Sequence, residues 1–196
     1  MMTTELTWLG HGTWLIETNG TKLILDPFLD DNPSAPIQAA DVDVDYILVS
    51  HGHFDHVSDA ASIANRTGAT VITNYEISEW LGSKHLVENR LGMNIGGSVQ
   101  MPFGRVKMTL AFHSSMLPDG SNGGMACGLL LTLEEDKRVY FACDTALFED
   151  MKRIGSAGLE LAVVPIGDLF TMGPDDAHQA VQLLKPRRAA AAHYNT

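Results

Sequence analysis

The chain has 196 residues, a length typical of one compact domain, so we expect a single domain over residues 1–196. Hydrophobic residues make up 45% and charged residues 19%, as in a globular protein rather than a disordered one. The formal net charge of −11 disfavours nucleic acid and anionic membranes as partners, because the overall field repels phosphate groups. We see no apolar run of about 20 residues that would span a bilayer and no basic leader followed by an apolar stretch, so a cytoplasmic location is the default expectation.

The first half of the sequence predicts strands that alternate with helices. Apolar runs and turn signals predict five strands and two helices. The strands are expected at 6–9, 13–17, 22–25, 46–50 and 69–73, and the helices at 58–66 and 76–81. Asn19-Gly20 is a typical hairpin turn, and Gly68 is a typical helix end. This alternation indicates an α/β fold.

The second half is again rich in predicted strands. A glycine-rich loop at 94–98 precedes an apolar hairpin through 106–112, 128–133 and 138–142, a strand at 159–165, a helix at 174–185 and a strand at 189–192. The two halves weakly resemble each other, since each has a strand followed by a histidine (His11, His113) and a later strand that ends near an aspartate (Asp26, Asp144). A duplicated half predicts two face-to-face sheets with helices outside, which is a four-layer αββα sandwich.

The segment Ser50-His51-Gly52-His53-Phe54-Asp55-His56 is the strongest chemical signal in the chain. It places three imidazoles and a carboxylate directly after a predicted buried strand. Imidazole nitrogens and carboxylate oxygens are typical zinc ligands, and Gly52 allows the tight backbone turn that directs them to one centre. A solvated polar loop is the alternative interpretation. We favour metal binding, with His51 and His53 sharing one ion, and Asp55 and His56 facing a second.

Two metal ions need further ligands, and three residues in the second half have a suitable context. His113, Asp144 and His193 each follow an apolar strand at or near its end. Ligands at strand ends are held rigidly by the sheet and can converge on a shared site. For each residue alone, a core or surface role is equally plausible, but their common placement favours a metal site.

His51-x-His53-x-Asp55-His56, followed by His113, Asp144 and His193, resembles the metallo-β-lactamase superfamily over nearly the whole chain. The resemblance implies the αββα metallo-β-lactamase fold. It also implies that His51, His53 and His113 bind one metal ion, that Asp55, His56 and His193 bind the other, and that Asp144 bridges both. It further implies that Asp26 supports the metal loop by hydrogen bonding.

Shorter phrases resemble small bacterial lactamase-like hydrolases related to L-ascorbate-6-phosphate lactonase. These phrases are Leu9-Gly10-His11, Leu25-Asp26-Pro27-Phe28, Met93-Asn94-Ile95-Gly96-Gly97, Phe112-His113-Ser114-Ser115, Pro165-Ile166-Gly167-Asp168, Phe170-Thr171-Met172-Gly173-Pro174 and His193-Tyr194-Asn195-Thr196. Members of this group continue beyond the last phrase, so we expect the sequence to lack the final elements of the fold, a helix and a strand.

The expected activity is metal-dependent hydrolysis of a small ester, lactone or phosphoester by a hydroxide that bridges two divalent ions. The first alternative is a phosphodiesterase that acts on phospholipids or nucleotides, and the second is a non-catalytic module that binds metal or ligand. We expect zinc, with Mn²⁺, Fe²⁺ or Ni²⁺ as alternatives, because affinity alone does not identify the metal. His53 supports hydrolysis, since the superfamily's diiron redox members carry an acidic residue at that position. The expected partner is a small molecule, and the sequence leaves homo-oligomerisation open.

Four residues are candidates for direct roles in the reaction. Asp55 can orient the attacking water and pass a proton to the leaving group. His11 follows the first strand, and it either donates a hydrogen bond to the substrate or is a buried histidine bonded to the backbone. Asp168 and Thr171 follow a predicted strand and are candidate substrate-binding residues, although Asp168 is slightly more typical of a turn-capping residue.

Overall fold

The computed structural model describes residues 4–195, which form two compact units. Of the described residues, the first unit contains 4–94 and 114–126, and the second contains 95–113 and 127–195. Each unit is built on one six-stranded mixed sheet. The expectation of one domain over residues 1–196 stays a prediction.

The sheet of the first unit has its strands in sequence order. The strands are β1 (Glu5–Trp8), β2 (Trp14–Thr18), β3 (Thr21–Leu25), β4 (Tyr46–Leu48), β5 (Thr70–Asn74) and β6 (Arg90–Met93). The pairs from β1 to β3 are antiparallel, and the pairs from β3 to β6 are parallel. Strands β3 to β5 are rich in buried Ile, Leu and Val, as is typical of parallel strands with covered faces.

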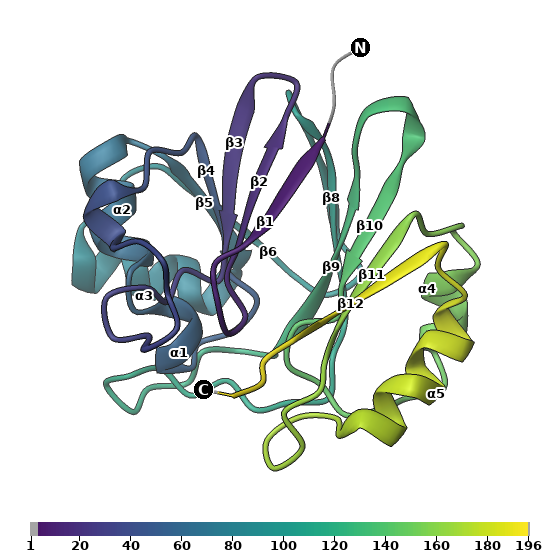
Figure 1. Ribbon diagram of the computed structural model, residues 1–196. Coiled ribbons are helices and arrows are strands. Elements are labelled where there is room, and N and C mark those ends of the chain that lie inside the picture. Colours follow the sequence, from purple (N-terminus) through teal and green to yellow (C-terminus); the bar gives the residue numbers. More distant parts are fainter. Residues whose placement is uncertain (1–3, 196) are drawn as a thin grey trace. The chain divides into compact units, whose positions relative to one another are not determined.

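Helices α2 and α3 lie along one side of this sheet (Figure 1). The helices of the unit are η1 (Ala39–Asp41, a 3-10 turn), α1 (Phe54–Val57), α2 (Ala60–Thr67) and α3 (Tyr75–His85). Helix α2 ends at Gly68, whose φ of 75° suits the left-handed cap, and Asn74 caps α3 by accepting a hydrogen bond from the Ile77 amide. Ile63 of α2 and Ile77 of α3 belong to the buried core beside the sheet.

The second unit repeats the mixed-sheet design, again with its strands in sequence order across the sheet. Its strands are β7 (Ser98–Met101), β8 (Gly104–Leu110), β9 (Cys127–Thr132), β10 (Arg138–Phe141), β11 (Leu161–Pro165) and β12 (Arg188–Ala192). The order across the sheet is β12-β11-β10-β9-β8-β7, in which β10, β11 and β12 are parallel and the other neighbours are antiparallel.

Helices α4 and α5 pack together in this second unit, and α5 also packs on β11 (Figure 1). The helical segments are η2 (Glu134–Asp136, a 3-10 turn), α4 (Met151–Gly155) and α5 (Pro174–Leu184). Pro174 occupies the first helical position of α5, where its missing N–H costs nothing. Ala177, Ala180 and Leu184 form the buried side of α5. Among residues 4–195, no helix is both long and apolar enough to cross a membrane.

Most predicted elements are present, and the differences are local. Asn19 and Gly20 both have positive φ (53° and 72°), as the predicted hairpin turn requires. Helix α3 extends beyond the predicted 76–81. The prediction ended too early because the last turn of the helix is exposed and has no apolar periodicity. Strands β6 and β7 and helix α4 were not predicted. The two strands have burial patterns without a fully buried residue, and α4 has five residues, so their apolar signals are weak.

Candidate metal centre

In the first unit, the candidate ligands and the supporting residue Asp26 lie at the carboxyl ends of two neighbouring parallel strands. Asp26 directly follows β3, and the segment 51–56 follows β4 after two residues. Because carboxyl ends of parallel strands share one sheet edge, the two segments meet, and the Asp26 amide donates to the Leu48 carbonyl at 2.8 Å. His53 is the residue before α1, so the chain turns within the cluster itself.

Asp26 organises this cluster through three hydrogen bonds. Its side chain is 1% exposed. Oδ1 accepts from the Ser50 amide at 2.7 Å, and Oδ2 accepts from the Ser50 hydroxyl at 2.6 Å and from His56 Nδ1 at 2.9 Å. The expected hydrogen bonds from Asp26 to the segment 50–56 are therefore present, and metal binding by that segment stays a prediction.

These bonds determine which ring nitrogens can bind a metal. A carboxylate only accepts, so the Nδ1 of His56 carries the proton, and its Nε2 carries the lone pair. The Ser50 hydroxyl gives its one proton to Asp26, so it accepts from His51 Nδ1 at 2.9 Å. His51 therefore also presents the lone pair of Nε2. Fixing the tautomer in this way is what hydrogen-bond partners behind metal-binding histidines do.

Donor atoms within the first unit are spaced as shared ligands would be. His51 Nε2 lies 3.0 Å from His53 Nδ1, and His56 Nε2 lies 3.7 Å from Asp55 Oδ2. Two ligands about 2.0–2.1 Å from one tetrahedral zinc ion would be about 3.3 Å apart. The distances fit two ligand pairs, one for each of two ions. The Ser114 hydroxyl oxygen lies 3.2 Å from His53 Nε2 and can form a hydrogen bond with it. His53 Nδ1, which lies beside His51 Nε2, is then the candidate ligand atom of that ring.

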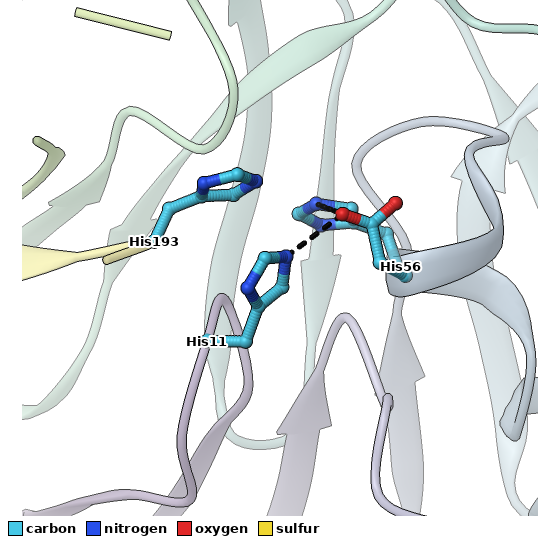
Figure 2. Close-up of side chains that lie close together, drawn as sticks. His11, His56 and His193 are labelled. Atoms are coloured by element: carbon cyan, nitrogen blue, oxygen red, sulfur yellow. Dashed lines mark hydrogen bonds and ion pairs between the residues drawn. The ribbon is translucent and has the colours of Figure 1, made fainter. Parts of the chain in front are cut away.

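His11 contacts Asp55, an arrangement that neither sequence interpretation of His11 included. Its Nε2 lies 2.8 Å from Asp55 Oδ2, and the His11 side chain is 4% exposed against 34% for Asp55. The rings of His11 and His56 lie with their centroids 5.4 Å apart and their planes tilted by 57°, and Figure 2 shows both side chains. The pairing brings together residues 44 positions apart in the sequence, which no local motif could indicate.

In the second unit, Asp144 lies between the two predicted histidines. Its Oδ2 is 3.5 Å from His113 Nε2 and 3.1 Å from His193 Nε2. His113 follows β8, Asp144 follows β10 and His193 follows β12, and all three strands run in the same direction. One carboxylate oxygen near two imidazole nitrogens is a suitable arrangement for a bridging ligand.

Asp168 and Thr171 lie in the turn between β11 and α5. The Asp168 amide donates to the Met172 carbonyl at 3.1 Å, and the Thr171 amide donates to the Asp168 carbonyl at 3.2 Å. Asp168 is exposed and has a φ of 71°. The turn role that the sequence slightly favoured is therefore present, and the substrate-binding role of both residues stays a prediction.

Supporting residues that the sequence did not single out surround the metal loop of the first unit. The buried Ser115 hydroxyl accepts from the Gly52 amide at 3.0 Å and donates to the Gly123 carbonyl at 2.9 Å. Asn74 also donates to that carbonyl, at 2.7 Å, so the segment 114–126 is tied both to the loop and to the start of α3. The one available signal was that Ser115 follows two residues after the candidate ligand His113.

Asp59, which lies just after α1, connects that part of the chain to residues 29 and 30 by hydrogen bonds. Its Oδ2 accepts from the Leu29 amide at 2.6 Å and from the Asp30 amide at 3.3 Å. Burial raises the pKa of Asp59, although the two backbone hydrogen bonds partly oppose the rise. Burial of this carboxylate therefore costs desolvation free energy, and the two hydrogen bonds that hold residues 29 and 30 offset part of that cost.

Comparison with known proteins identifies the family. Residues 21–194 match the model of the β-lactamase superfamily domain. A metal-dependent hydrolase of Thermus thermophilus is 43% identical over 192 residues, covering 98% of this chain and 84% of that protein. One from Bacillus subtilis is 46% identical over 198 residues, covering 98% of this chain and 86% of that protein.

A solved structure with the same fold agrees. It is that of a metallo hydrolase from the archaeon Ignicoccus hospitalis, with a TM-score of 0.87, 32% sequence identity, and coverage of 98% of this chain and 83% of that chain. The expected metallo-β-lactamase fold is therefore confirmed, with two mixed sheets that carry helices. The chain therefore belongs to the family defined by the β-lactamase superfamily domain.

Proposed function

We propose that this protein hydrolyses a small ester, lactone or phosphoester, using two divalent metal ions held by seven side chains. The protein is a metal-dependent hydrolase of the β-lactamase superfamily, and the proposal concerns the metal number, the ligands and the substrate class. The proposed ligands are His51, His53, Asp55, His56, His113, Asp144 and His193.

The observation that carries the proposal is the tautomer control by Asp26. The Nδ1 atoms of His51 and His56 donate to Ser50 and Asp26, respectively. The Nε2 atoms of both rings therefore carry the lone pairs that a metal ion can use. A polar surface loop has no need for a fully buried carboxylate that orients two imidazoles. Such an arrangement is typical of metal-binding histidines.

The proposed ligand sets follow the donor pairs within each unit. His51 and His53 are proposed for one ion together with His113, and Asp55 and His56 for the other together with His193. Asp144, which lies near both His113 and His193, is proposed to serve both ions. Two divalent ions, when bound, lower the pKa of a water and polarise a carbonyl or phosphoryl oxygen. The mixture of imidazole and carboxylate donors supports zinc and also suits Mn²⁺, Fe²⁺ or Ni²⁺.

Asp55 and His11 are the proposed residues for proton movement. Asp55 Oδ2 contacts His11 Nε2 at 2.8 Å, and the partly exposed Asp55 carboxylate is accessible to solvent. Asp55 can accept a proton from the attacking water, and His11 holds the carboxylate in place through its Nε2. His11 is therefore proposed as a positioning residue, with direct substrate binding as its second role.

The substrate is proposed to be small and not a nucleic acid. The net charge of −11 opposes binding of a polyanion, whereas the metal ions add about four positive charges for one anionic group. Asp168 and Thr171, in the exposed turn after β11, are the proposed substrate contacts of the second unit.

The replacement of Asp55 by Asn tests the proposed proton transfer. Asp55→Asn keeps the size and one acceptor oxygen but removes the base, so kcat should fall by about 10²- to 10⁴-fold. Metal content is measured in parallel by elemental analysis. Asp43→Asn, at an exposed position of the same unit, is the matched control. Full turnover by an Asp55→Asn protein that retains two metal ions per chain would contradict the proposal.

A substrate panel tests the proposed class. It contains simple lactones, p-nitrophenyl acetate, p-nitrophenyl phosphate and bis-p-nitrophenyl phosphate, each assayed with the zinc-loaded and the chelator-treated protein. Metal-dependent turnover of a lactone, carboxylic ester or phosphomonoester supports the proposal. Turnover of the phosphodiester alone would replace it with a phosphodiesterase, and two bound ions without turnover on any substrate would indicate a binding module.

A further inference from the structure

A cavity on the helical side of the first unit is separate from the proposed metal ligands. It has a volume of about 590 Å³, within the range of about 300–1,000 Å³ that is typical of small-molecule pockets. All of its lining residues belong to the first unit: Phe54, Val57, Ser58, Ala61, Trp80, Lys84, His85, Pro118 and Asp119. None of the seven proposed metal ligands is among them.

Two aromatic side chains form the walls of this cavity. Phe54 of α1 is 48% exposed, although its ring packs edge-on against Phe28 with centroids 5.4 Å apart. Trp80 of α3 packs against the His85 ring with centroids 4.3 Å apart. Val57 and Ala61 add aliphatic surface to the lining. An apolar group bound in the cavity would remove part of these surfaces from water.

Trp80 is held in one orientation by Asp119. The indole Nε1 donates to Asp119 Oδ2 at 2.9 Å, and Asp119 Oδ1 accepts from the Ser121 amide at 3.0 Å and from the Ser121 hydroxyl. These hydrogen bonds, first that of the Ser121 hydroxyl, then that of Trp80 and then that of the Ser121 amide, lower the pKa of Asp119 to about 2. Both carboxylate oxygens are therefore already engaged, and Asp119 is ionised at neutral pH.

The polar groups that are left for a ligand are basic. Lys84 and His85 lie in the last turn of α3, and both are exposed. Within the part of the chain that the structure describes, Lys84 makes no salt bridge, and it acts on Asp119 only as a nearby charge. An apolar cavity with an ammonium group at its rim is complementary to an apolar molecule that carries one negative charge.

We propose that this cavity is a second ligand site, which binds a small apolar carboxylate between Phe54 and Trp80 with its anionic group on Lys84. Aromatic and aliphatic carboxylates share this chemistry. The site is positioned to affect the metal loop, because Phe54 directly precedes Asp55 and packs on Phe28, whose ring contacts His11 edge-on with centroids 5.5 Å apart. The proposal does not depend on the substrate of the metal centre.

Fluorescence titration with two probes of similar shape tests the site. Anilinonaphthalene sulfonate is an aromatic anion, and phenylnaphthylamine is its uncharged counterpart. We expect saturable binding of the anion with one equivalent per chain and its displacement by phenylacetate or octanoate. In Lys84→Ala, the Kd of the anion should rise about threefold while that of the neutral probe stays unchanged, because an exposed ion pair contributes little but measurably. Lys152→Ala, at an exposed position in the second unit, is the matched control.

A second set of variants tests the apolar walls. Ala61→Phe should fill the cavity, and Trp80→Ala should remove one wall, so both should weaken both probes at least tenfold. Circular dichroism establishes that each variant is folded, and either variant is sufficient if the other fails to fold. Wild-type affinity for both probes in a folded wall variant would overturn the site. An equal loss of both probes in Lys84→Ala, or no displacement by either carboxylate, would overturn the anionic specificity.

Discussion

Replacement of Asp26 by Asn should impair metal binding without removing a single ligand. In the wild-type chain, the Asp26 carboxylate accepts from His56 Nδ1, and this leaves the His56 Nε2 lone pair for a metal ion. In Asp26→Asn, the amide oxygen must face the Ser50 amide, so the NH₂ group faces His56 Nδ1. His56 Nδ1 then has to accept, the ring proton moves to Nε2, and the lone pair of Nε2 is lost.

The magnitude follows from the role of such supporting groups. Loss of the hydrogen-bond partner of a metal-binding histidine typically costs 10- to 100-fold in metal affinity, which is about 1.4–2.8 kcal/mol. The assay is a competition titration of zinc against a chromophoric chelator, with kcat/KM for the best substrate of the panel measured alongside. The new NH₂ group also faces the Ser50 hydroxyl, which can then no longer donate to residue 26 and accept from His51 Nδ1 as it does in the wild type. Both resolved zinc affinities should therefore fall.

The control for this prediction is the same chemical change at another buried aspartate. Asp59 accepts only backbone amide hydrogen bonds from Leu29 and Asp30, and an amide oxygen can accept these as well. Asp59→Asn should therefore retain wild-type zinc affinity. If Asp26→Asn binds both zinc ions as tightly as Asp59→Asn and the wild type do, the tautomer argument is wrong.

Two further predictions concern stability. Ser115→Ala removes the acceptor of the buried Gly52 amide, whereas the Gly123 carbonyl keeps its bond from Asn74. Urea denaturation should therefore show a loss of about 1–3 kcal/mol in the free energy of unfolding. The exposed control Ser83→Ala should change that free energy by less than about 0.5 kcal/mol, and an equal change in both variants would refute the role of Ser115. Burial raises the pKa of Asp59 in the folded state above the ordinary value of 3.8, so its contribution to stability is most favourable below that pH and is lost as pH rises through the folded pKa. Asp59→Asn should therefore gain stability relative to the wild type as pH rises from 4 to 8 in denaturation curves, and a difference that is constant or falls with pH would contradict the burial effect.

The fold could be predicted where local signals agree with the tertiary environment. Asn19-Gly20 predicted a hairpin correctly, because both residues tolerate the positive φ that this turn needs. Strands β6 and β7 were missed, since their residues alternate between exposed and partly buried and never form an apolar run. Their places in the sheets depend on pairing with β5 and β8, which a local pattern does not contain.

The candidate site was predictable to a similar degree. The density of ligand-type side chains from His51 to His56 predicted a metal-binding loop, and strand ends indicated His113, Asp144 and His193 as further candidates. The support of this site was not visible in the sequence, because it comes from pairs that are distant in the chain. His11 reaches Asp55, and Ser115 reaches Gly52 across 63 positions. Polar residues in such pairs resemble ordinary loop residues until the chain is folded.

The backbone at the strand ends carries a cost that the chemistry explains. His11, Asp26 and His193 have φ values of 50°, 45° and 55°, in the left-handed region that glycine tolerates best. Each such residue costs of order 1–3 kcal/mol, and glycine would remove most of that cost but would supply no side chain. At Asp26 the conformation is held on both sides, because its amide donates to Leu48 and its carbonyl accepts from Thr13 Oγ1 at 2.7 Å. The fold thus retains strain at the positions where an imidazole or a carboxylate must leave the end of a strand, as is expected if those side chains serve the candidate metal site, directly or, for Asp26, through hydrogen bonds, rather than the apolar core.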